Sequence, residues 1–293
     1  MRPRVTLQLP RAIGAPRPLA GADVLLVGDG YVASALRPHL QAHGACVRAT
    51  QRDGPMALGT PDMRAAFRAA SHVLLSVPPG AGGDPVLAAL QDTPSRADWI
   101  GYLSATSVYG DRAGGWAFEG EAPTPGLRRG RWRADAEAAW LERHPRTQLF
   151  RLAGIYGPDR SPFARLRAGT ARVVRKPGHV VNRVHVDDIT ALLLRSMTRP
   201  SAGDILNVAD GAPAAPSEVL DHAASLLGLP PPPRVSIRDP QLSAMARSFY
   251  RDSKRVDVSR ARSRLGWAPR YPDYRAGLAA VLAVETTPQG WAV

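Results

Sequence analysis

The feature that most constrains this chain is a glycine-containing turn between an apolar strand and an amphipathic helix. Residues 22–27 form a short apolar run, typical of a strand buried on both faces of a sheet. The sequence continues as Gly28-Asp-Gly30-Tyr-Val-Ala33, and apolar residues then recur at helical spacing through residues 31–43. Here Gly28 permits the tight turn, Gly30 lets a phosphate approach the backbone, and Ala33 lets the helix pack closely on the strand. Because free N–H groups and a positive dipole mark the helix start, the pattern predicts a dinucleotide-binding site.

Strands and helices alternate along the following residues. This alternation predicts a parallel sheet wound in both directions with right-handed crossovers. The C-terminal third is mixed, and its Pro and Gly residues fall between elements and form no long linker. We therefore expect an α/β fold: a Rossmann-like, doubly wound parallel sheet with a small, interleaved C-terminal lobe. The apolar patterns predict strands at 46–50, 72–77, 99–103, 147–152 and 204–208, and helices at 63–70, 86–91, 133–143, 186–197, 217–227, 259–265 and 274–284.

The expected organisation has three parts. Residues 1–21 carry no acidic residue and show no hydrophobic periodicity, so we interpret them as a flexible N-terminal extension. Residues 22–210 form the dinucleotide-binding domain, of which 158–183 contribute to the substrate cleft. Residues 211–293 form the smaller C-terminal substrate lobe.

Composition excludes several classes of protein and leaves the meaning of the charge open. No apolar run approaches the roughly 20 residues that cross a bilayer. The single cysteine, Cys46, excludes an internal disulfide framework and favours a reducing, cytoplasmic location. The net charge is +13, and between Arg128 and Arg183 there are 14 basic and 4 acidic residues. Two explanations of this basic cluster are open: a pocket for an anionic cofactor or substrate, and a solvated basic face. A nucleic-acid groove explains it less well, because the segment lacks interleaved aromatic residues and a recognisable nucleic-acid-binding module.

The end of the second predicted strand indicates the cofactor. An acidic residue there binds the ribose 2′-hydroxyl of NAD, whereas an arginine accommodates the 2′-phosphate of NADP. Arg52 precedes Asp53, so we favour NADP over NAD. The alternative is that Arg52 faces solvent and that Asp53-Gly54 makes a turn.

Several further motifs resemble a known superfamily. The chain is similar to the extended and atypical short-chain dehydrogenase/reductases, in the NAD(P)-dependent epimerase/dehydratase branch, over roughly residues 23–282. The resemblance rests on the order and spacing of its motifs. Besides Gly28-Asp-Gly30 with Ala33, these are Leu-Ser-Ala-Thr-Ser-Val-Tyr-Gly110, Arg151-Leu-Ala-Gly-Ile-Tyr-Gly-Pro158, Arg183-Val-His-Val-Asp-Asp188, Asn207-Val-Ala-Asp, Ser253-Lys-Arg-Val256 and Arg264-Leu-Gly-Trp267. The Ser76-Val-Pro-Pro-Gly80 segment resembles an atypical subgroup.

The resemblance implies that the chain has a cofactor site and that the usual catalytic residues are replaced. Enzymes of this superfamily use a Ser or Thr, a Tyr, and a Lys four residues after the Tyr, which share one helix face. In this chain those positions hold Ala105, Arg129 and Arg133, counted from Val108 and from Glu137. The only Tyr-x-x-x-Lys, at Tyr250 and Lys254, falls far from the expected helix, and we interpret it as chance. The cofactor-binding residues that we expect are Gly28, Asp29, Gly30, Tyr31, Val32, Ala33, Arg52, Ser76, Val77, Pro78 and Ile155.

Other groups are candidates for the missing chemistry. Thr106 lies beside the vacated position, Tyr109 would serve as an acid if a nearby cation lowered its pKa, and Arg133 would hold the cofactor ribose or phosphate. Each has a structural alternative, because a Tyr in Val-Tyr-Gly usually packs its ring and small hydroxyls often end a strand. The residues that we expect to bind an anionic substrate are Lys176, Arg183, Lys254 and Arg255.

The remaining motifs point away from metal and hydrolase chemistry. His185 precedes Asp187 and Asp188, and we interpret this segment as a turn into a helix with an Asp as its N-cap. The histidines show no ligand spacing, so we expect no metal. We expect a small-molecule substrate and neither nucleic acid nor a membrane as partner, and the resemblance is compatible with a homodimer. Two functions stay open: an NAD(P)-dependent oxidoreductase or epimerase-like enzyme with a non-standard proton donor, and an idle NAD(P)-binding sensor or scaffold.

Overall fold

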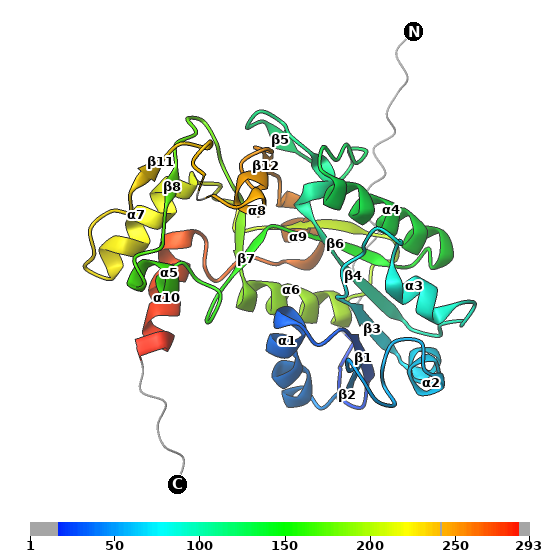
Figure 1. Ribbon diagram of the computed structural model, residues 1–293. Helices are drawn as coiled ribbons and strands as arrows, with labels where there is room; N and C mark the ends of the chain where they lie inside the picture. The colour runs from blue at the N-terminus through cyan, green and yellow to red at the C-terminus, as the bar shows by residue number, and fades with distance from the viewer. Residues whose placement is uncertain (1–16, 241, 287–293) are drawn as a thin grey trace.

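Parallel strands form the central sheet of the protein (Figure 1). In this computed structural model the described residues are 17–240 and 242–286. The six strands follow the order β2-β1-β3-β4-β6-β10, which confirms the predicted α/β, Rossmann-like fold. The strands are β1 (Asp23–Val27), β2 (Cys46–Ala49), β3 (His72–Leu75), β4 (Trp99–Ala105), β6 (Gln148–Leu152) and β10 (Ile205–Val208).

The sheet is covered by helices on both faces. In β1, Val24 and Leu26 belong to one apolar core, and Leu25 and Val27 belong to another on the opposite face. Because both faces are buried, the strands read as continuous apolar runs in the sequence. One face packs against α1 (Tyr31–Ala42), α6 (Val186–Thr198) and α9 (Ser259–Leu265), and the other against α2 (Pro61–Ala69), α3 (Pro85–Leu90) and α4 (Arg128–Arg143).

The chain reverses its winding direction between β1 and β3. Helix α1 joins β1 to β2 across one face, and α2 joins β2 to β3 across the other. Open α/β sheets bind ligands outside the carboxyl ends of the strands at such a switch point. The turn at 28–30 follows β1 and the segment 76–80 follows β3, and Ser76 N donates to Val27 O at 2.9 Å. The fold thus brings together the two segments that the sequence assigned to the cofactor.

A smaller lobe lies beside the sheet domain, at the left of Figure 1. Its core combines Phe163 and Leu166 with Val219, Ala223 and Leu278. Because β8 pairs with β11, residues of the 158–183 segment join the C-terminal lobe. The elements of the lobe are α5 (Phe163–Arg167), β8 (Val173–Val174), α7 (Pro216–Leu226), β11 (Arg234–Val235), α8 (Ala244–Ser248) and α10 (Tyr274–Thr286).

The C-terminal segment does not belong wholly to this lobe, which corrects the predicted boundary at residues 211–293. Strand β12 (Arg255–Val256) pairs with β5 (Trp116–Ala117) in the sheet domain. Helix α9 packs there too, through Ala261, Leu265 and the following Trp267, in the same core as α1 and α6. The chain therefore leaves the lobe after α8, returns to the sheet domain, and re-enters the lobe at α10. The remaining short elements are η1 (Thr106–Tyr109), β7 (Gly154–Tyr156) and β9 (Arg183–His185), of which β7 and β9 pair.

The described part of the N-terminal extension packs on the sheet domain. Leu19 is 3% exposed, and Arg17 N donates to Thr198 O at 2.8 Å. The prediction of a flexible extension is therefore wrong for residues 17–21, because the apolar Leu19 side chain joins the core. Residues 1–16, the rest of that prediction, lie outside the described residues. Among the helices of the described chain, none combines the length and apolarity that a membrane span requires.

Candidate active site

The first part of the site is the turn after β1. Gly28 has φ +96°, and a Cβ added there would lie 2.5 Å from Ser76 Oγ. Its N–H donates to Thr50 Oγ1 at 2.8 Å, and Ser76 Oγ donates to Gly28 O at 3.0 Å. The turn is thus fixed to the ends of β2 and β3, and only glycine meets both its φ and its space.

Gly30 presents an open backbone to solvent. A Cβ added at Gly30 would have no neighbour within 4 Å among the described atoms. Gly30 is the N-cap of α1, where no side-chain cap bond and no first-turn acid occurs within the described chain. Asp29 is turned aside, because its Oδ1 pairs with Arg37 Nη2 at 2.6 Å. The first-turn N–H groups and the helix dipole therefore face open space that fits the diphosphate of NAD(P).

The next residues of the turn join the cofactor side to the body of the protein. Val32 and Ala33 are buried under the sheet and make the close helix–strand packing that the sequence predicts. Tyr31 Oη donates to Pro158 O at 2.7 Å, and the guanidinium carbon of Arg160 lies 5.5 Å from the centre of the Tyr31 ring. Burial raises the pKa of Tyr31 to about 12, so its hydroxyl remains a donor at neutral pH.

The other expected cofactor residues lie at three places. Ser76, Val77 and Pro78 follow β3, the neighbour of β1, and Ser76 and Val77 lie against Gly28 of the glycine turn. Ile155 is half-buried in β7, where it pairs with Val184 of β9. Arg52 is exposed three residues after the end of β2. The fold brings the first group together with the turn, whereas Arg52 lies at the outer edge of the sheet.

The positions of the superfamily's catalytic groups lie where β4 meets α4. Ala105 ends β4, and the half-buried Thr106 begins η1 beside it. A Cβ on Gly130 would lie 2.6 Å from Ser107 O, so α4 packs directly on η1 at this point. Arg133 is committed to β4: its Nη1 donates to Leu103 O at 2.7 Å, and its guanidinium carbon lies 5.6 Å from the Tyr102 ring centre. This packing accounts for Arg133 without the cofactor contact that the sequence suggested.

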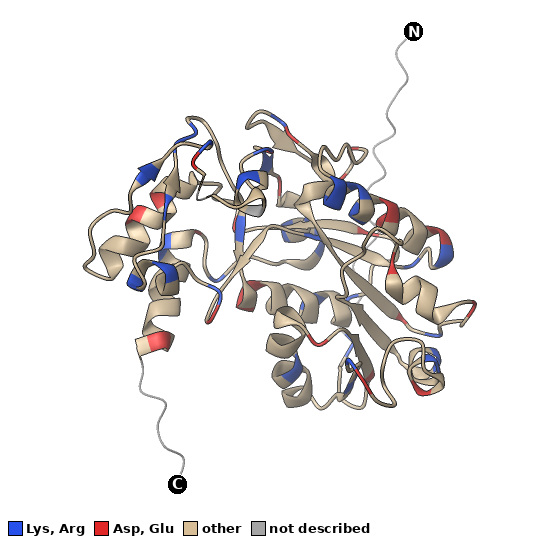
Figure 2. Cartoon of the chain, viewed as in Figure 1, with Lys and Arg blue, Asp and Glu red and all other residues tan. Residues whose placement is uncertain are grey.

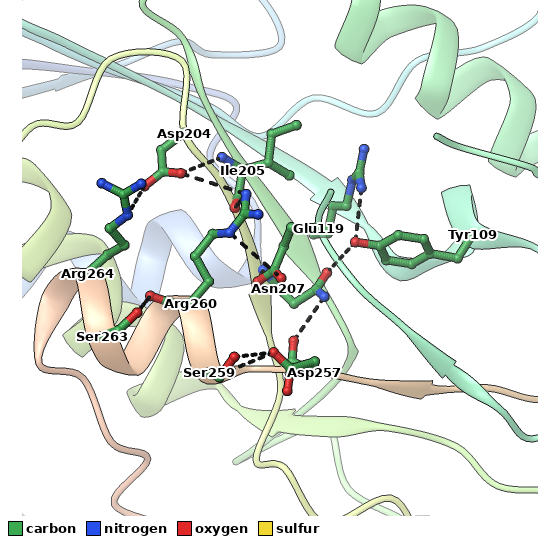
Figure 3. A network of polar contacts seen from close by, with 11 residues as sticks. Tyr109, Glu119, Asp204, Ile205, Asn207, Asp257, Ser259, Arg260, Ser263 and Arg264 are labelled. Atoms are coloured by element: carbon green, nitrogen blue, oxygen red, sulfur yellow. Dashed lines mark hydrogen bonds and ion pairs between the residues drawn. The ribbon is translucent and has the colours of Figure 1, made fainter. Parts of the chain in front are cut away.

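Tyr109 is a core residue, which corrects its prediction as an acid. Its side chain is fully buried, and its Oη donates to Asn207 Oδ1 at 2.8 Å and accepts from Arg151 Nη1 at 2.9 Å (Figure 3). The sequence suggested that Tyr109 would serve as an acid if a nearby cation lowered its pKa. Burial instead raises it, because the loss of solvation outweighs the attraction of Arg151.

Beneath these residues lies a buried polar network. Arg151 Nη2 pairs with Glu137 Oε2 at 2.7 Å, and both side chains are at most 3% exposed. Ser104 Oγ donates to the same carboxylate. On the other side, Glu119 Oε1 accepts from Asn207 N at 3.0 Å, near Arg260 in Figure 3. These contacts fix the carboxyl ends of β4, β6 and β10 relative to one another and leave the network no access to substrate.

A cavity of about 610 Å³ lies in the smaller lobe. The described residues that line it include no Asp or Glu. Arginines and aromatic side chains supply its polar and flat surfaces: Arg160, Arg165, Arg172, Arg183, Tyr156, Phe249, Tyr250 and Tyr274. Sequence reasoning found Arg183 and missed the other three arginines, although all four lie in the basic segment between residues 128 and 183. The arrangement suits an anion attached to a flat or apolar group.

The other three expected substrate residues do not line this cavity. Lys176 Nζ donates to Tyr250 O and is exposed. Arg255 Nη1 donates to Gly114 O. Lys254 is buried, its Nζ lies 4.0 Å from Asp252 Oδ2, and burial lowers its pKa. These cations serve the junction of the lobe with the sheet domain.

Three buried acidic and imidazole groups outside the cavity lining bind backbone N–H groups. Asp210 Oδ1 accepts from Ala212 N at 2.9 Å, and burial raises the pKa of Asp210 to about 7. The N-cap of α6 is His185, whose Nδ1 accepts from Asp187 N at 3.2 Å, so the prediction of an Asp cap is wrong. Asp188 is instead buried and accepts from Arg270 N at 2.5 Å. It holds the chain that leads into α10.

Comparison with known proteins shows which sequences this chain is similar to. No family model matches it. It is 34% identical to protein YeeZ of Escherichia coli K12 over 180 residues, 61% of this chain and 60% of YeeZ. It is 30% identical to a 3-diazoavenalumate denitrifying reductase of Streptomyces over 172 residues, 54% of this chain and 55% of the reductase. The chain thus spans less than two thirds of these curated relatives.

Solved structures match over a longer range. A conserved protein of unknown function from Silicibacter pomeroyi is 41% identical, with a TM-score of 0.81 over 90% of this chain and 99% of that protein. The chain belongs to the same family as this protein. The family has the fold of the NAD(P)-dependent epimerases and extended short-chain dehydrogenase/reductases, as the sequence predicted.

Two more distant structures show the fold with cofactor bound. MoeE5 in complex with UDP-glucose and NAD has a TM-score of 0.73 at 24% identity, over 89% of this chain and 97% of MoeE5. The human epimerase family protein SDR39U1 with NADPH has a TM-score of 0.75 at 17% identity, over 89% of this chain and 99% of that protein. Of these two structural neighbours, one is in complex with NAD and the other with NADPH.

Proposed function

We propose that the protein is an NAD(P)-dependent oxidoreductase or epimerase-like enzyme acting on a small anionic substrate. The observation that carries this proposal is the arginine-lined cavity next to the dinucleotide turn. Four guanidinium groups without a lining carboxylate favour phosphate or carboxylate groups, which arginine binds bidentately. The aromatic side chains favour a ligand with a flat or apolar portion, including a sugar.

The nicotinamide, when bound, would supply hydride exchange, and the residues of the chain would bind and orient the cofactor and the substrate. The first turn of α1 holds the cofactor diphosphate, and Gly30 keeps side-chain atoms away from it. The arginines of the cavity hold the substrate anion and thereby fix its reacting carbon. Thr106 Oγ1, beside the vacated position of Ala105, donates a hydrogen bond to the substrate oxygen.

We further propose that NADP is preferred over NAD. Arg52 is exposed and follows Thr50, whose Oγ1 holds the glycine turn. A cation at this edge suits the 2′-phosphate of NADP. Arg52 precedes Asp53 along the chain, so the first charged residue after β2 is the cation and not the acid.

A second candidate is a dinucleotide-binding sensor without turnover. The observation that favours it is the loss of the catalytic groups at Ala105, Arg129 and Arg133. The hydrogen bond from Arg133 Nη1 to Leu103 O also favours this function. Such a protein would bind NADPH and the anion and respond by a change in stability or association.

Turnover with NADPH distinguishes the two functions. We expect NADPH oxidation, followed at the absorbance of the reduced nicotinamide, with a member of a panel of phosphorylated and carboxylated aldehydes and ketones. Thr106→Val should lower kcat by about 10². The matched control, Tyr109→Phe, removes a buried hydroxyl and should leave kcat near that of the wild type while lowering stability. NADPH binding at micromolar affinity without turnover across the panel would favour the sensor.

A further inference from the structure

One side chain lies between the two ligand sites. Arg160 lines the cavity, and its guanidinium also stacks on Tyr31, the first residue of α1. Tyr31 directly follows Gly30, where the cofactor diphosphate is expected. Arg160 is therefore the cavity arginine that also contacts the turn of the dinucleotide site.

The backbone that carries Arg160 is fixed against the same tyrosine. Tyr31 Oη donates to Pro158 O at 2.7 Å, and a Cβ added to Gly157, at φ +159°, would lie 2.5 Å from Tyr31 Oη. Gly157 and Arg160 bond each other's backbone, with Arg160 N donating to Gly157 O at 3.0 Å. A side chain larger than hydrogen at Gly157 would displace this loop. The position of Arg160 is thus set by the start of α1.

The position of Arg160 affects the electrostatics of the two ligand sites. A cofactor diphosphate at α1 and an anion in the cavity would repel each other, because like charges at neighbouring sites interact over several ångströms. A cation between the two sites, here the exposed Arg160, offsets part of that repulsion. Arg160 lowers the pKa of Tyr31, whereas Asp159 and Asp187 raise it, so among these three charges Arg160 is the one that would favour a bound anion.

We propose that Arg160 couples the two sites, so that anion binding in the cavity depends on Arg160 more strongly when the cofactor is bound. The inference rests on the proposed function, which places the substrate anion in this cavity. Arg172 provides a contrast within the same cavity. Its Nη1 donates to Gly169 O and Ala171 O, each at 2.9 Å, in the smaller lobe.

The coupling is measured by isothermal titration calorimetry with inorganic pyrophosphate, with and without saturating NADP⁺. Pyrophosphate also binds the helix end when NADP⁺ is absent, so the component that Arg172→Gln weakens identifies the cavity. We expect Arg172→Gln to weaken this component by the same factor in both conditions. Arg160→Gln should weaken it at least about fivefold more with NADP⁺ than without.

The outcomes separate this inference from the proposed function. Equal losses for Arg160→Gln with and without NADP⁺ would overturn the coupling while leaving the cavity as an anion site. If Arg172→Gln and Arg160→Gln leave every binding component unchanged, the cavity does not take anions, and the proposed function fails together with the coupling. A circular dichroism spectrum and unfolding midpoint close to the wild type establish that each variant is folded.

Discussion

A single methyl group at Gly30 should separate cofactor binding from folding. Gly30 has φ −86° and ψ −176°, which any residue adopts, and an added Cβ would meet no described atom within 4 Å. Alanine is a poorer N-cap than glycine by about 0.5–1 kcal/mol, whereas restricting the unfolded chain returns about 0.4–1 kcal/mol. We therefore expect Gly30→Ala to change the free energy of unfolding by less than about 0.5 kcal/mol.

The same methyl group should exclude the cofactor. It projects into the space where a diphosphate oxygen must reach the N–H groups of the first turn. Losing one hydrogen bond to a charged oxygen costs about 1.5–3 kcal/mol, which corresponds to a rise in Kd of about 10- to 100-fold. Calorimetric titration with NADPH measures the loss in binding, and urea unfolding measures stability.

Two matched variants complete this test. Gly82→Ala also adds a Cβ in open space, but outside the turn, so it should leave NADPH binding unchanged and raise the free energy of unfolding by at most about 1 kcal/mol. Gly28→Ala meets Ser76 Oγ at 2.5 Å and requires φ +96°, so it should lower stability by about 1–3 kcal/mol. If Gly30→Ala binds NADPH as tightly as the wild type, the diphosphate does not lie at this helix end and the reasoning is refuted.

Three further predictions concern specificity and stability. Arg52→Ala should weaken NADP⁺ binding about tenfold more than NAD⁺ binding in calorimetry, and equal losses would contradict the assignment of the 2′-phosphate. Burial raises the pKa of Asp210 to about 7, so the folded state holds a proton that the unfolded state releases, and stability should fall as pH rises from 4 to 7. Asp210→Asn should remove this fall. In urea unfolding, its free energy of unfolding should exceed that of the wild type by at most about 4 kcal/mol at pH 8 and should equal it at pH 3.5. The exposed control Asp92→Asn should keep the wild-type pH profile. Arg151→Met leaves the buried Glu137 carboxylate without its partner and should lower the free energy of unfolding by about 3–5 kcal/mol. The double variant Arg151→Met with Glu137→Leu should regain most of this loss. If Arg151→Met alone is as stable as the wild type, the buried pair is contradicted.

The sequence was sufficient for the sheet and for the dinucleotide turn. Strands β1, β3, β4 and β6 were predictable because each is buried on both faces and therefore reads as an apolar run. Gly28 was predictable because its positive φ is a local requirement for glycine, and Gly30 because the motif marks where a phosphate approaches the backbone. Motif order further predicted the superfamily fold and the loss of its catalytic groups.

The candidate site was less predictable, because it depends on contacts between distant segments. Tyr109 lies near Thr106 in sequence, yet its hydroxyl contacts Asn207 and Arg151, so burial and pKa could not be inferred locally. Two-residue strands such as β12 carry too few residues to show a period, and their pairing with β5 exists only in the folded chain.

The amino-acid sequence by itself determined which elements form and where the backbone can approach a phosphate, since apolar periodicity and glycine geometry act over a few residues. The tertiary structure alone decided which charges share a cavity. Arg160, Arg172 and Arg183 meet there with aromatic side chains from the segment after α8 and from α10, because β8 pairs with β11 and the chain re-enters the lobe at α10. Charge is a property of each residue, but an anion site requires several charges within a few ångströms, and only the long-range packing of the lobe supplies that proximity.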